Sequence, residues 1–210
     1  LAIANDWMHK NPFAGIRFQE KEVIREVLTK EEIERMMCKE FALPRLEYVR
    51  DVFIFCVFTG MAYVDVNNLR QEHIVRDNND DLWIRKARQK TNNMCNIPLL
   101  KIPQLLMEKY KNHPLCTKTG ALLPVPSNQK MNSYLKEIAD FCGIQKNLTT
   151  HTARHTFATV VALANGVSME NIAKMLGHSD IRMTQRYAKV MDSSIMRDME
   201  NVDKLFKSSE

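Results

Sequence analysis

The segment HTARH, residues 151–155, places two histidines and one arginine within five residues of the chain. His151 and His155 are four residues apart, so on a helix they share one face, as the histidines of a zinc-binding HExxH motif do. Arg154 instead offers a fork of N–H donors that matches two oxygens of a phosphate, and His151 can donate to the same group or exchange a proton with it. These residues alone leave a metal site and a phosphate site as competing interpretations.

The metal interpretation has two weaknesses. Thr152 stands where the metalloprotease motif needs its glutamate base, and no third ligand is evident. A structural alternative makes His155 a buried, hydrogen-bonded side chain and His151 a helix cap. We therefore expect no metal site, and a metallohydrolase built on the two histidines stays as an alternative function.

A second group of reactive residue types lies in MLGHSDIRMTQRYAKV, residues 175–190. His178 follows Arg154 by 24 residues, and Tyr187 follows His178 by nine. Ser179 and Asp180 are suited to cap a helix that carries the tyrosine. Because an isolated HxxR pattern is common by chance, the phosphate interpretation depends on this downstream group.

The elements that must position these residues are mostly helices. Thr29 and Glu32 have the spacing of a capping box, and apolar residues over 45–58 repeat at helical spacing up to Gly60, which is suited to a left-handed cap. Further helices are predicted over residues 64–69, 102–112, 128–141, 150–165, 168–176, 180–187 and 190–206. Short β-prone runs at 73–75, 81–86 and 93–100 predict one small three-stranded antiparallel sheet, so the fold class is α+β and mainly α.

Length and composition favour a globular domain and argue against a membrane-spanning protein. The 210 residues suffice for one sizeable domain, and a hydrophobic fraction of 45% is ordinary for a globular protein. The five cysteines lie far apart without a CxxC motif, which favours reduced thiols in a cytoplasmic protein. A net charge of +5 permits a polyanionic partner. No apolar run approaches a membrane span, and because the chain begins at Leu1 we expect a fragment of a longer protein.

In combination, HTARH, the later LGH and the tyrosine nine residues beyond it resemble the tyrosine recombinase (phage integrase) family. Upstream, FTGMAYVDVNNL (58–69) resembles the Thr-Gly segment of that family, and RKARQKTNNMCNIPL (85–99) resembles its β-hairpin, with a lysine beside the turn. The resemblance covers about residues 26–190. It implies a helical recombinase catalytic domain and a site-specific recombinase or integrase function.

In that family a tyrosine hydroxyl attacks a DNA phosphodiester, forms a 3′-phosphotyrosyl link and frees a 5′-hydroxyl, without metal, ATP or another cofactor. Arginines aimed at the non-bridging oxygens stabilise the negative charge of the transition state. By position, the resemblance implies Tyr187 as the nucleophile and Arg154, His151 and His178 around the phosphate. Lys90 best matches the acid for the leaving oxygen, with Lys86 and Arg88 as rivals. It also implies supporting roles for Asp65 and His155, and DNA contacts from Lys86, Arg88 and Lys90.

One position departs from the family pattern. The family has its first catalytic arginine two residues after Thr-Gly, where this chain has Ala62. Either the domain is a catalytically impaired DNA-binding relic, or another arginine replaces the missing one. We expect Arg50, on the preceding helix, to be the substitute, followed by Arg88 and then Arg70. The variant segment resembles integrases of Bacteroidetes conjugative transposons and related elements, which favours an active enzyme.

The resemblance also predicts domain organisation and partners. Residues 1–25 are expected to be the end of an upstream domain and a linker, 26–190 the catalytic domain, and 191–210 an amphipathic tail helix. The expected partners are double-stranded DNA and further copies of the chain, in a tetramer joined through that tail, with no membrane. The sequence context argues against a type IB topoisomerase, which uses similar chemistry without strand exchange.

Overall fold

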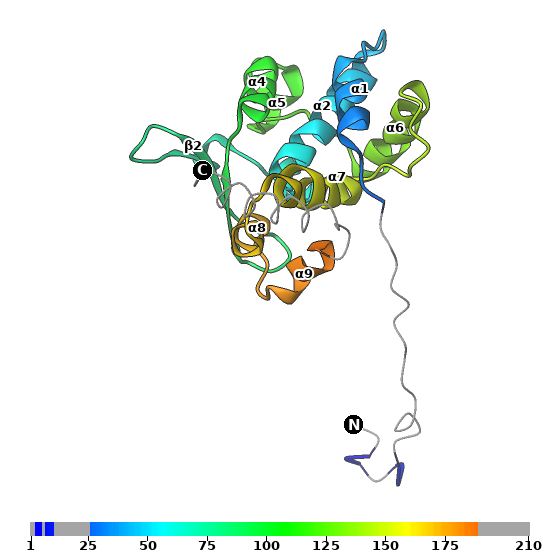
Figure 1. Ribbon diagram of the computed structural model, residues 1–210, viewed down its shortest axis with the longest axis vertical. Helices are drawn as coiled ribbons and strands as arrows, with labels where there is room; N and C mark the ends of the chain where they lie inside the picture. Colours follow the sequence, from blue (N-terminus) through cyan, green and yellow to red (C-terminus); the bar gives the residue numbers. More distant parts are fainter. Residues whose placement is uncertain (1–2, 6, 11–25, 189–210) are drawn as a thin grey trace, which may run out of the picture.

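The computed structural model describes residues 3–5, 7–10 and 26–188 (Figure 1). Its helices and strands are α1 (Lys30–Cys38), α2 (Pro44–Thr59), α3 (Tyr63–Asn67), η1 (Gln71–His73), β1 (Ile74–Arg76), β2 (Leu82–Ala87), β3 (Met94–Pro98), α4 (Lys101–Tyr110), α5 (Pro114–Thr119), α6 (Asn128–Phe141), α7 (Thr150–Thr156), η2 (Phe157–Ala162), η3 (Leu163–Asn165), α8 (Met169–Leu176) and α9 (Arg182–Ala188). This order confirms the α+β class. The predicted tail helix at 190–206 and most of the predicted linker lie outside the described residues.

Helix α2 is the centre of the domain. Every residue from Val49 to Val57 is buried, so the helix is covered on all its faces over this stretch, as expected for a helix surrounded by other elements. Helices α1, α4, α6 and α7 pack against it. In Figure 1, α7 crosses beneath this group and separates it from α8 and α9. The carboxyl end of α2 therefore lies close to the elements that carry the reactive residues.

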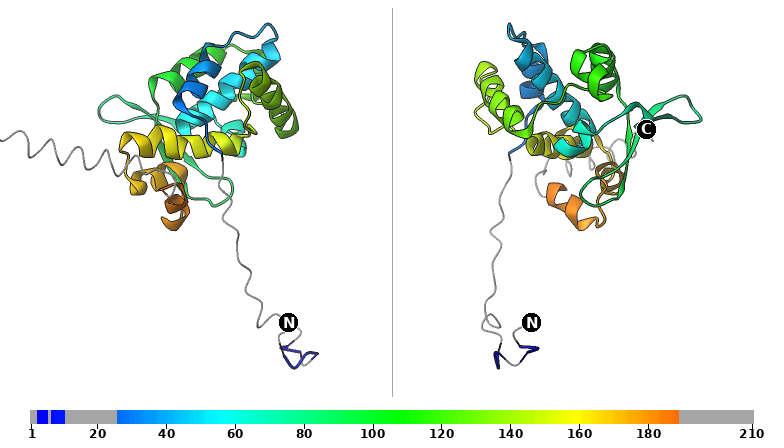
Figure 2. Two further views of the ribbon diagram at one scale, coloured as in Figure 1. Left: turned by 45° about the vertical axis from the view of Figure 1, so that its right-hand side comes forward. Right: turned by 180° about the vertical axis from the view of Figure 1, so that it is seen from behind.

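The sheet is the predicted three-stranded antiparallel one, in the order β1-β2-β3. Ile84 on β2 pairs with Ile74 on β1 and Ile97 on β3, and Ile84 and Ile97 are buried. Strand β3 packs against α8. The sheet lies beside the helices, and one of its hairpins projects away from them in both views of Figure 2. The β2–β3 connection is thereby held next to α8.

The chain after HTARH differs from the single helix predicted over 150–165. Regular α-helix ends at Thr156 and continues as a π-helical segment and then a 3-10 turn. The hydroxyls of Thr156 and Thr159 donate to the carbonyls of Thr152 and His155, one turn earlier, and such back-bonding competes with the regular ladder and bends helices. The sequence analysis also missed α5, although its Pro114 start and left-handed Gly120 end are readable helix signals.

Arg50 has a structural position, so the expectation that it replaces the missing arginine is wrong. Its Nη1 donates to the carbonyls of Met36, Met37 and Lys39 at the end of α1, at 3.0, 3.0 and 2.9 Å, and its Nε pairs with Asp51. It also lies ten residues before Gly60, about 15 Å along the helix axis. The guanidinium therefore binds the orphan carbonyls of α1 instead of facing the reactive residues.

Among the described residues, no helix is long and apolar enough to cross a membrane.

We expect Arg50→Ala to destabilise the fold by about 3 kcal/mol, because it removes a buried partner from Asp51 and leaves three carbonyls without their donor. Urea unfolding followed by circular dichroism measures this loss. Arg76→Ala is the control, because the Arg76 side chain is 58% exposed and pairs only with Asp80 at the surface. Equal stabilities of the two variants would contradict the structural role of Arg50.

Candidate active site

The guanidinium of Arg154 is fixed by backbone carbonyls from two other parts of the fold. Its Nη1 donates to the Gly60 carbonyl and its Nη2 to the Leu176 carbonyl, both at 2.7 Å. Only 4% of the residue is exposed. Because α2, α7 and α8 all end or pass at this point, their packing sets both the position and the orientation of the cation.

Gly60 permits this arrangement for two reasons. Its φ of +68° is left-handed, which a side chain disfavours. A Cβ at this position would also lie 2.4 Å from Phe157 Cδ1 and 2.6 Å from Leu176 Cδ2. The Thr-Gly pair therefore ends α2 tightly enough for its carbonyl to reach Arg154.

His178 lies beside this cation and is held through both ring nitrogens. Its Nε2 is 3.2 Å from Arg154 Nη2 and its Nδ1 is 2.9 Å from Thr184 Oγ1. A guanidinium can only donate, so Nε2 accepts and Nδ1 carries the proton. Burial, followed by the charges of Arg154 and Arg88, lowers the pKa of His178 to about 4. The imidazole is therefore neutral near pH 7.

Tyr187 is buried in an aromatic cluster with two histidines. Its ring stacks on His178 with an interplanar angle of 10° and meets the edge of His155 at a centroid distance of 4.9 Å. Only 6% of the residue is exposed. The Tyr187 hydroxyl also acts on Arg154: burial and the Arg88 charge lower the pKa of that guanidinium, and the tyrosine opposes them. The tyrosine and the guanidinium thus face each other.

His151 and His155 contact each other. Their Nε2 atoms are 2.9 Å apart, so one nitrogen donates and the other accepts. His151 is exposed and His155 is half-buried, whereas the structural alternative expected a buried His155. That alternative also made His151 the cap, but Thr149 caps α7. Among the residues that the structure describes, no group of three or more His, Cys, Asp or Glu side chains is placed to hold a metal ion.

Arg88 brings a second guanidinium to the site from the β2–β3 connection. Its Nε lies 3.8 Å from the buried Asp65 carboxylate and has no hydrogen-bond partner. Its stem passes Gly177, where a Cβ would come within 3.0 Å of Arg88 Cδ and 2.8 Å of Cys95 Sγ. The glycine of the LGH segment therefore leaves room for Arg88 beside His178.

Asp65 ties the β2–β3 connection to the body of the domain. Its Oδ1 accepts from the Gln89 N–H at 2.9 Å, and its Oδ2 faces Arg88. Lys90 follows Gln89 in the exposed turn. The structure thus brings the predicted supporting residue Asp65 to the hairpin that carries the predicted acid.

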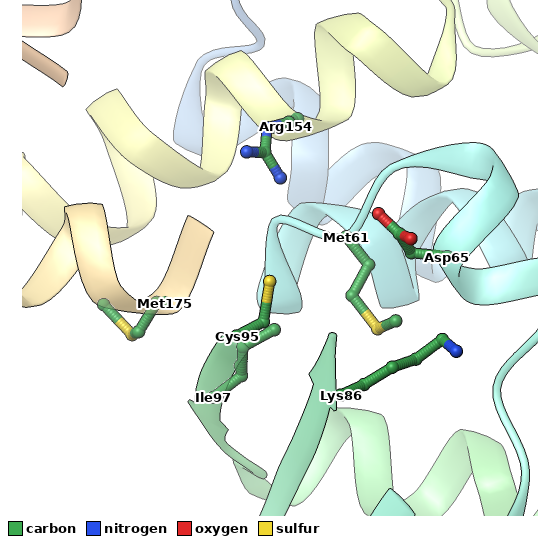
Figure 3. Close-up of a pocket in the computed structure, with 7 residues that line it drawn as sticks. All are labelled: Met61, Asp65, Lys86, Cys95, Ile97, Arg154 and Met175. Carbon is green, nitrogen blue, oxygen red and sulfur yellow. The ribbon is translucent and has the colours of Figure 1, made fainter. Parts of the chain in front are cut away.

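Lys86 and Arg154 line one small pocket together with Met61, Asp65, Cys95, Ile97 and Met175 (Figure 3). In Figure 3, Arg154 descends into it from α7, and Cys95 rises from β3. Lys86 Nζ lies 3.4 Å from His73 Nε2, away from the guanidinium. Lys86 is therefore less directly placed than Arg88 to reach an anion at Arg154.

The groups that orient the predicted residues were not predicted from the sequence. The carbonyls of Gly60 and Leu176 carry no sequence signal, because every residue has one. No motif marks Thr184 or Cys95, and only the fold places their side chains beside His178 and Arg88.

The lowered pKa of His178 makes stability depend on pH. The unfolded histidine titrates near 6.5 and the folded one near 4, so the unfolded state binds more protons between these values. The contribution of His178 is complete above about pH 6.5 and is lost as the pH falls to about 4. We expect His178→Gln to flatten this part of the stability profile, measured by urea unfolding between pH 4 and 7; an unchanged slope would contradict it.

Comparisons with known proteins agree with this geometry. The sequence profile of the phage integrase family matches residues 26–194. The tyrosine recombinase XerD of Staphylococcus saprophyticus is 40% identical over 95 residues, which are 45% of this chain and 31% of that protein. XerD of Staphylococcus aureus is 42% identical over 71 residues, or 34% of this chain and 24% of the relative. The chain thus spans about a third of the length of these curated relatives.

Solved structures share the fold. A lambda integrase dimer bound to a core site has a TM-score of 0.67 at 19% identity, covering 89% of this chain and 67% of that one. The Tn1549 transposon integrase in complex with a circular intermediate DNA has a TM-score of 0.65 at 18% identity, covering 96% and 74%. Together with the profile match over most of the sequence, these similarities establish that the chain belongs to the phage integrase family.

Proposed function

We propose that this chain is the catalytic part of a site-specific recombinase that cleaves and rejoins DNA strands through Tyr187. The observation that carries the proposal is the convergence of a buried tyrosine on an arginine whose orientation is fixed by two carbonyls. Family membership and the XerD relatives support this class of reaction. The relic alternative is not favoured, because a second guanidinium, Arg88, lies beside the first.

The proposed reaction exchanges one phosphodiester for another. The Tyr187 oxygen attacks phosphorus while its proton leaves to a neighbouring base, for which our candidate is His155, whose ring meets the Tyr187 ring and whose Nε2 is paired with His151. The P–O5′ bond breaks, and Lys90 supplies the proton that the 5′-oxygen takes up. Attack by a 5′-hydroxyl of another strand reverses these steps. Because bond energy is kept in the phosphotyrosyl link, the reaction needs neither metal nor ATP.

Arg88 is our candidate for the arginine that Ala62 lacks. Within the part of the chain that the structure describes, the Asp65 carboxylate alone lies within ion-pair distance of it, and its Nε has no hydrogen-bond partner there. Its charge also contributes to the lowered pKa of both Arg154 and His178. Two guanidiniums with one carboxylate between them leave an excess of positive charge, which a phosphate would neutralise.

The partners follow from the same proposal. Double-stranded DNA is the substrate, and we expect Lys86, Arg88 and Lys90 to contact it along the β2–β3 hairpin. Binding by Lys and Arg to phosphates weakens steeply with salt. We keep the predicted domain boundaries, at 26–190 for the catalytic unit and 191–210 for the tail. We also propose that the tail joins copies of the chain into a tetramer and that the protein is cytoplasmic.

A covalent adduct tests the function directly. Nicked duplexes from the ends of the DNA element that encodes the chain are incubated with the protein in EDTA and separated on a denaturing gel. We expect an adduct whose mapped residue is Tyr187 and which Tyr187→Phe abolishes, because no other hydroxyl replaces the nucleophile. Failure to form an adduct in a protein that binds the duplex, or an adduct that needs a metal ion, would contradict the proposal.

Replacing Arg88 tests the substitution for Ala62. Arg88→Met keeps the stem against Gly177 and removes the charge, so we expect a slowing of adduct formation by about 10²–10³, the usual effect of losing one transition-state contact. Single-turnover assays measure the rate. Arg76→Ala is the control for a lost surface cation and should keep the parental rate. Full activity of Arg88→Met would exclude Arg88 as the substitute.

A further inference from the structure

Thr184 is a buried side chain beside the reactive residues, and it has no role in the proposed reaction. It is fully buried on α9, three residues before Tyr187. Its hydroxyl is 2.9 Å from His178 Nδ1, and its N–H donates to the Ile181 carbonyl at 2.8 Å. The same residue therefore fixes the first turn of the nucleophile helix and holds the ring of His178.

The hydrogen bonds of His178 as observed do not suit a phosphate. Its Nε2 accepts from Arg154, so the proton is on Nδ1 and is donated to Thr184 Oγ1. A phosphate oxygen can only accept. For Nε2 to donate to that oxygen, the neutral ring must carry its proton on Nε2, and Nδ1 must then receive a hydrogen bond from its neighbour.

A hydroxyl is the side-chain group that can satisfy Nδ1 in either tautomer, because it donates or accepts after rotation about one bond. No heavy atom has to move. A carbonyl at the same place would hold the proton on Nδ1 permanently, and an apolar group would leave Nδ1 without a partner, which is costly at a buried position.

We propose that Thr184 is a positioning residue whose hydroxyl reverses its hydrogen bond to His178 when a phosphate binds, so that Nε2 becomes a donor to that phosphate. In the same event the N–H of Arg154 Nη2 that faces His178 donates to a phosphate oxygen instead, while the other N–H of Nη2 stays on the Leu176 carbonyl. Nδ1 loses its proton to solvent and Nε2 gains one from solvent, so the net charge of the ring is unchanged. This inference rests on the proposed function, because the phosphate is the scissile group of the DNA.

The tautomer change of His178 can affect the nucleophile, because both His178 and Thr184 are in direct structural connection with Tyr187. The His178 ring stacks on Tyr187 with an interplanar angle of 10°, and Thr184 lies on the same helix as Tyr187. The charged and titratable groups that act on the ring are Arg154 from α7, Arg88 from the β2–β3 connection and Tyr187 from α9. The low pKa of His178, about 4, keeps the ring neutral, so that its tautomer decides which nitrogen donates.

The test compares Thr184→Val, which removes the hydroxyl at nearly constant shape, with Thr184→Ser, which keeps it. We expect Thr184→Val to slow single-turnover adduct formation by about 10- to 100-fold, the range known for the outer-shell partners of metal-bound histidines. Thr184→Ser, which keeps the hydroxyl, should react at nearly the parental rate. DNA affinity measured by fluorescence anisotropy should change little in both variants, because the many other contacts of Lys and Arg with the duplex backbone outweigh the single hydrogen bond from His178 Nε2.

Nitrogen-15 NMR of labelled histidine reads the tautomer independently of turnover. We expect the proton of His178 on Nδ1 in the protein alone and on Nε2 in a complex of Tyr187→Phe with uncleaved duplex. When Thr184→Val is added to Tyr187→Phe, we expect the proton of His178 not to move fully from Nδ1 to Nε2 in the complex. A proton that stays on Nδ1 in the complex, a doubly protonated ring, or a parental rate in Thr184→Val would overturn the inference. If the parent forms no adduct, the proposed function fails, while the NMR measurement still decides the inference.

Discussion

The pair of hydrogen bonds from Arg154 to the carbonyls of Gly60 and Leu176 is the constraint on which the rest of the site depends. Backbone carbonyls cannot change rotamer, so they orient the guanidinium more rigidly than side chains would. The left-handed turn at Gly60 and the packing of Phe157 against it bring the end of α2 to the right place. The remaining N–H groups of Arg154 are thereby directed toward His178 and the tyrosine, as preorganised binding of an anion requires.

The site carries an excess of positive charge, which favours the binding of an anion. Arg154 and Arg88 are both largely buried, and Asp65 is the carboxylate that faces them. Burial, together with the charge of Arg88, lowers the pKa of Arg154. Burial and the charges of both arginines also lower the pKa of His178, so its ring stays neutral. A buried excess of positive charge lowers stability unless an anion compensates it. A second buried ion network, around Asp51, lies near the middle of α2, where Lys109 and Arg50 neutralise the carboxylate.

The sequence predicted the class of fold, the sheet and the major helices, because caps and apolar periodicity are local properties of the chain, as at Thr29, Gly60 and over 45–58. The group of residues that meets at the site was implied by the resemblance to the recombinase family. Arg50 shows the limit of such reasoning. Its apolar neighbours on α2 correctly placed it near the buried edge, but only the fold shows that the end of α1 lies there. The placement of Arg88 depends equally on long-range packing against Gly177, and the π-helical turn after Thr156 has no signature in spacing.

The central claim is that Arg154 and Arg88 jointly form the phosphate site in spite of Ala62. The most direct measurement is a crystal structure of the Tyr187→Phe protein bound to its uncleaved duplex. We expect guanidinium nitrogens of both arginines to lie within hydrogen-bond distance of one phosphate, with Arg154 still held by the Gly60 and Leu176 carbonyls. A phosphate bound by Arg154 while Arg88 stays on Asp65, or by an arginine from another segment, would contradict it.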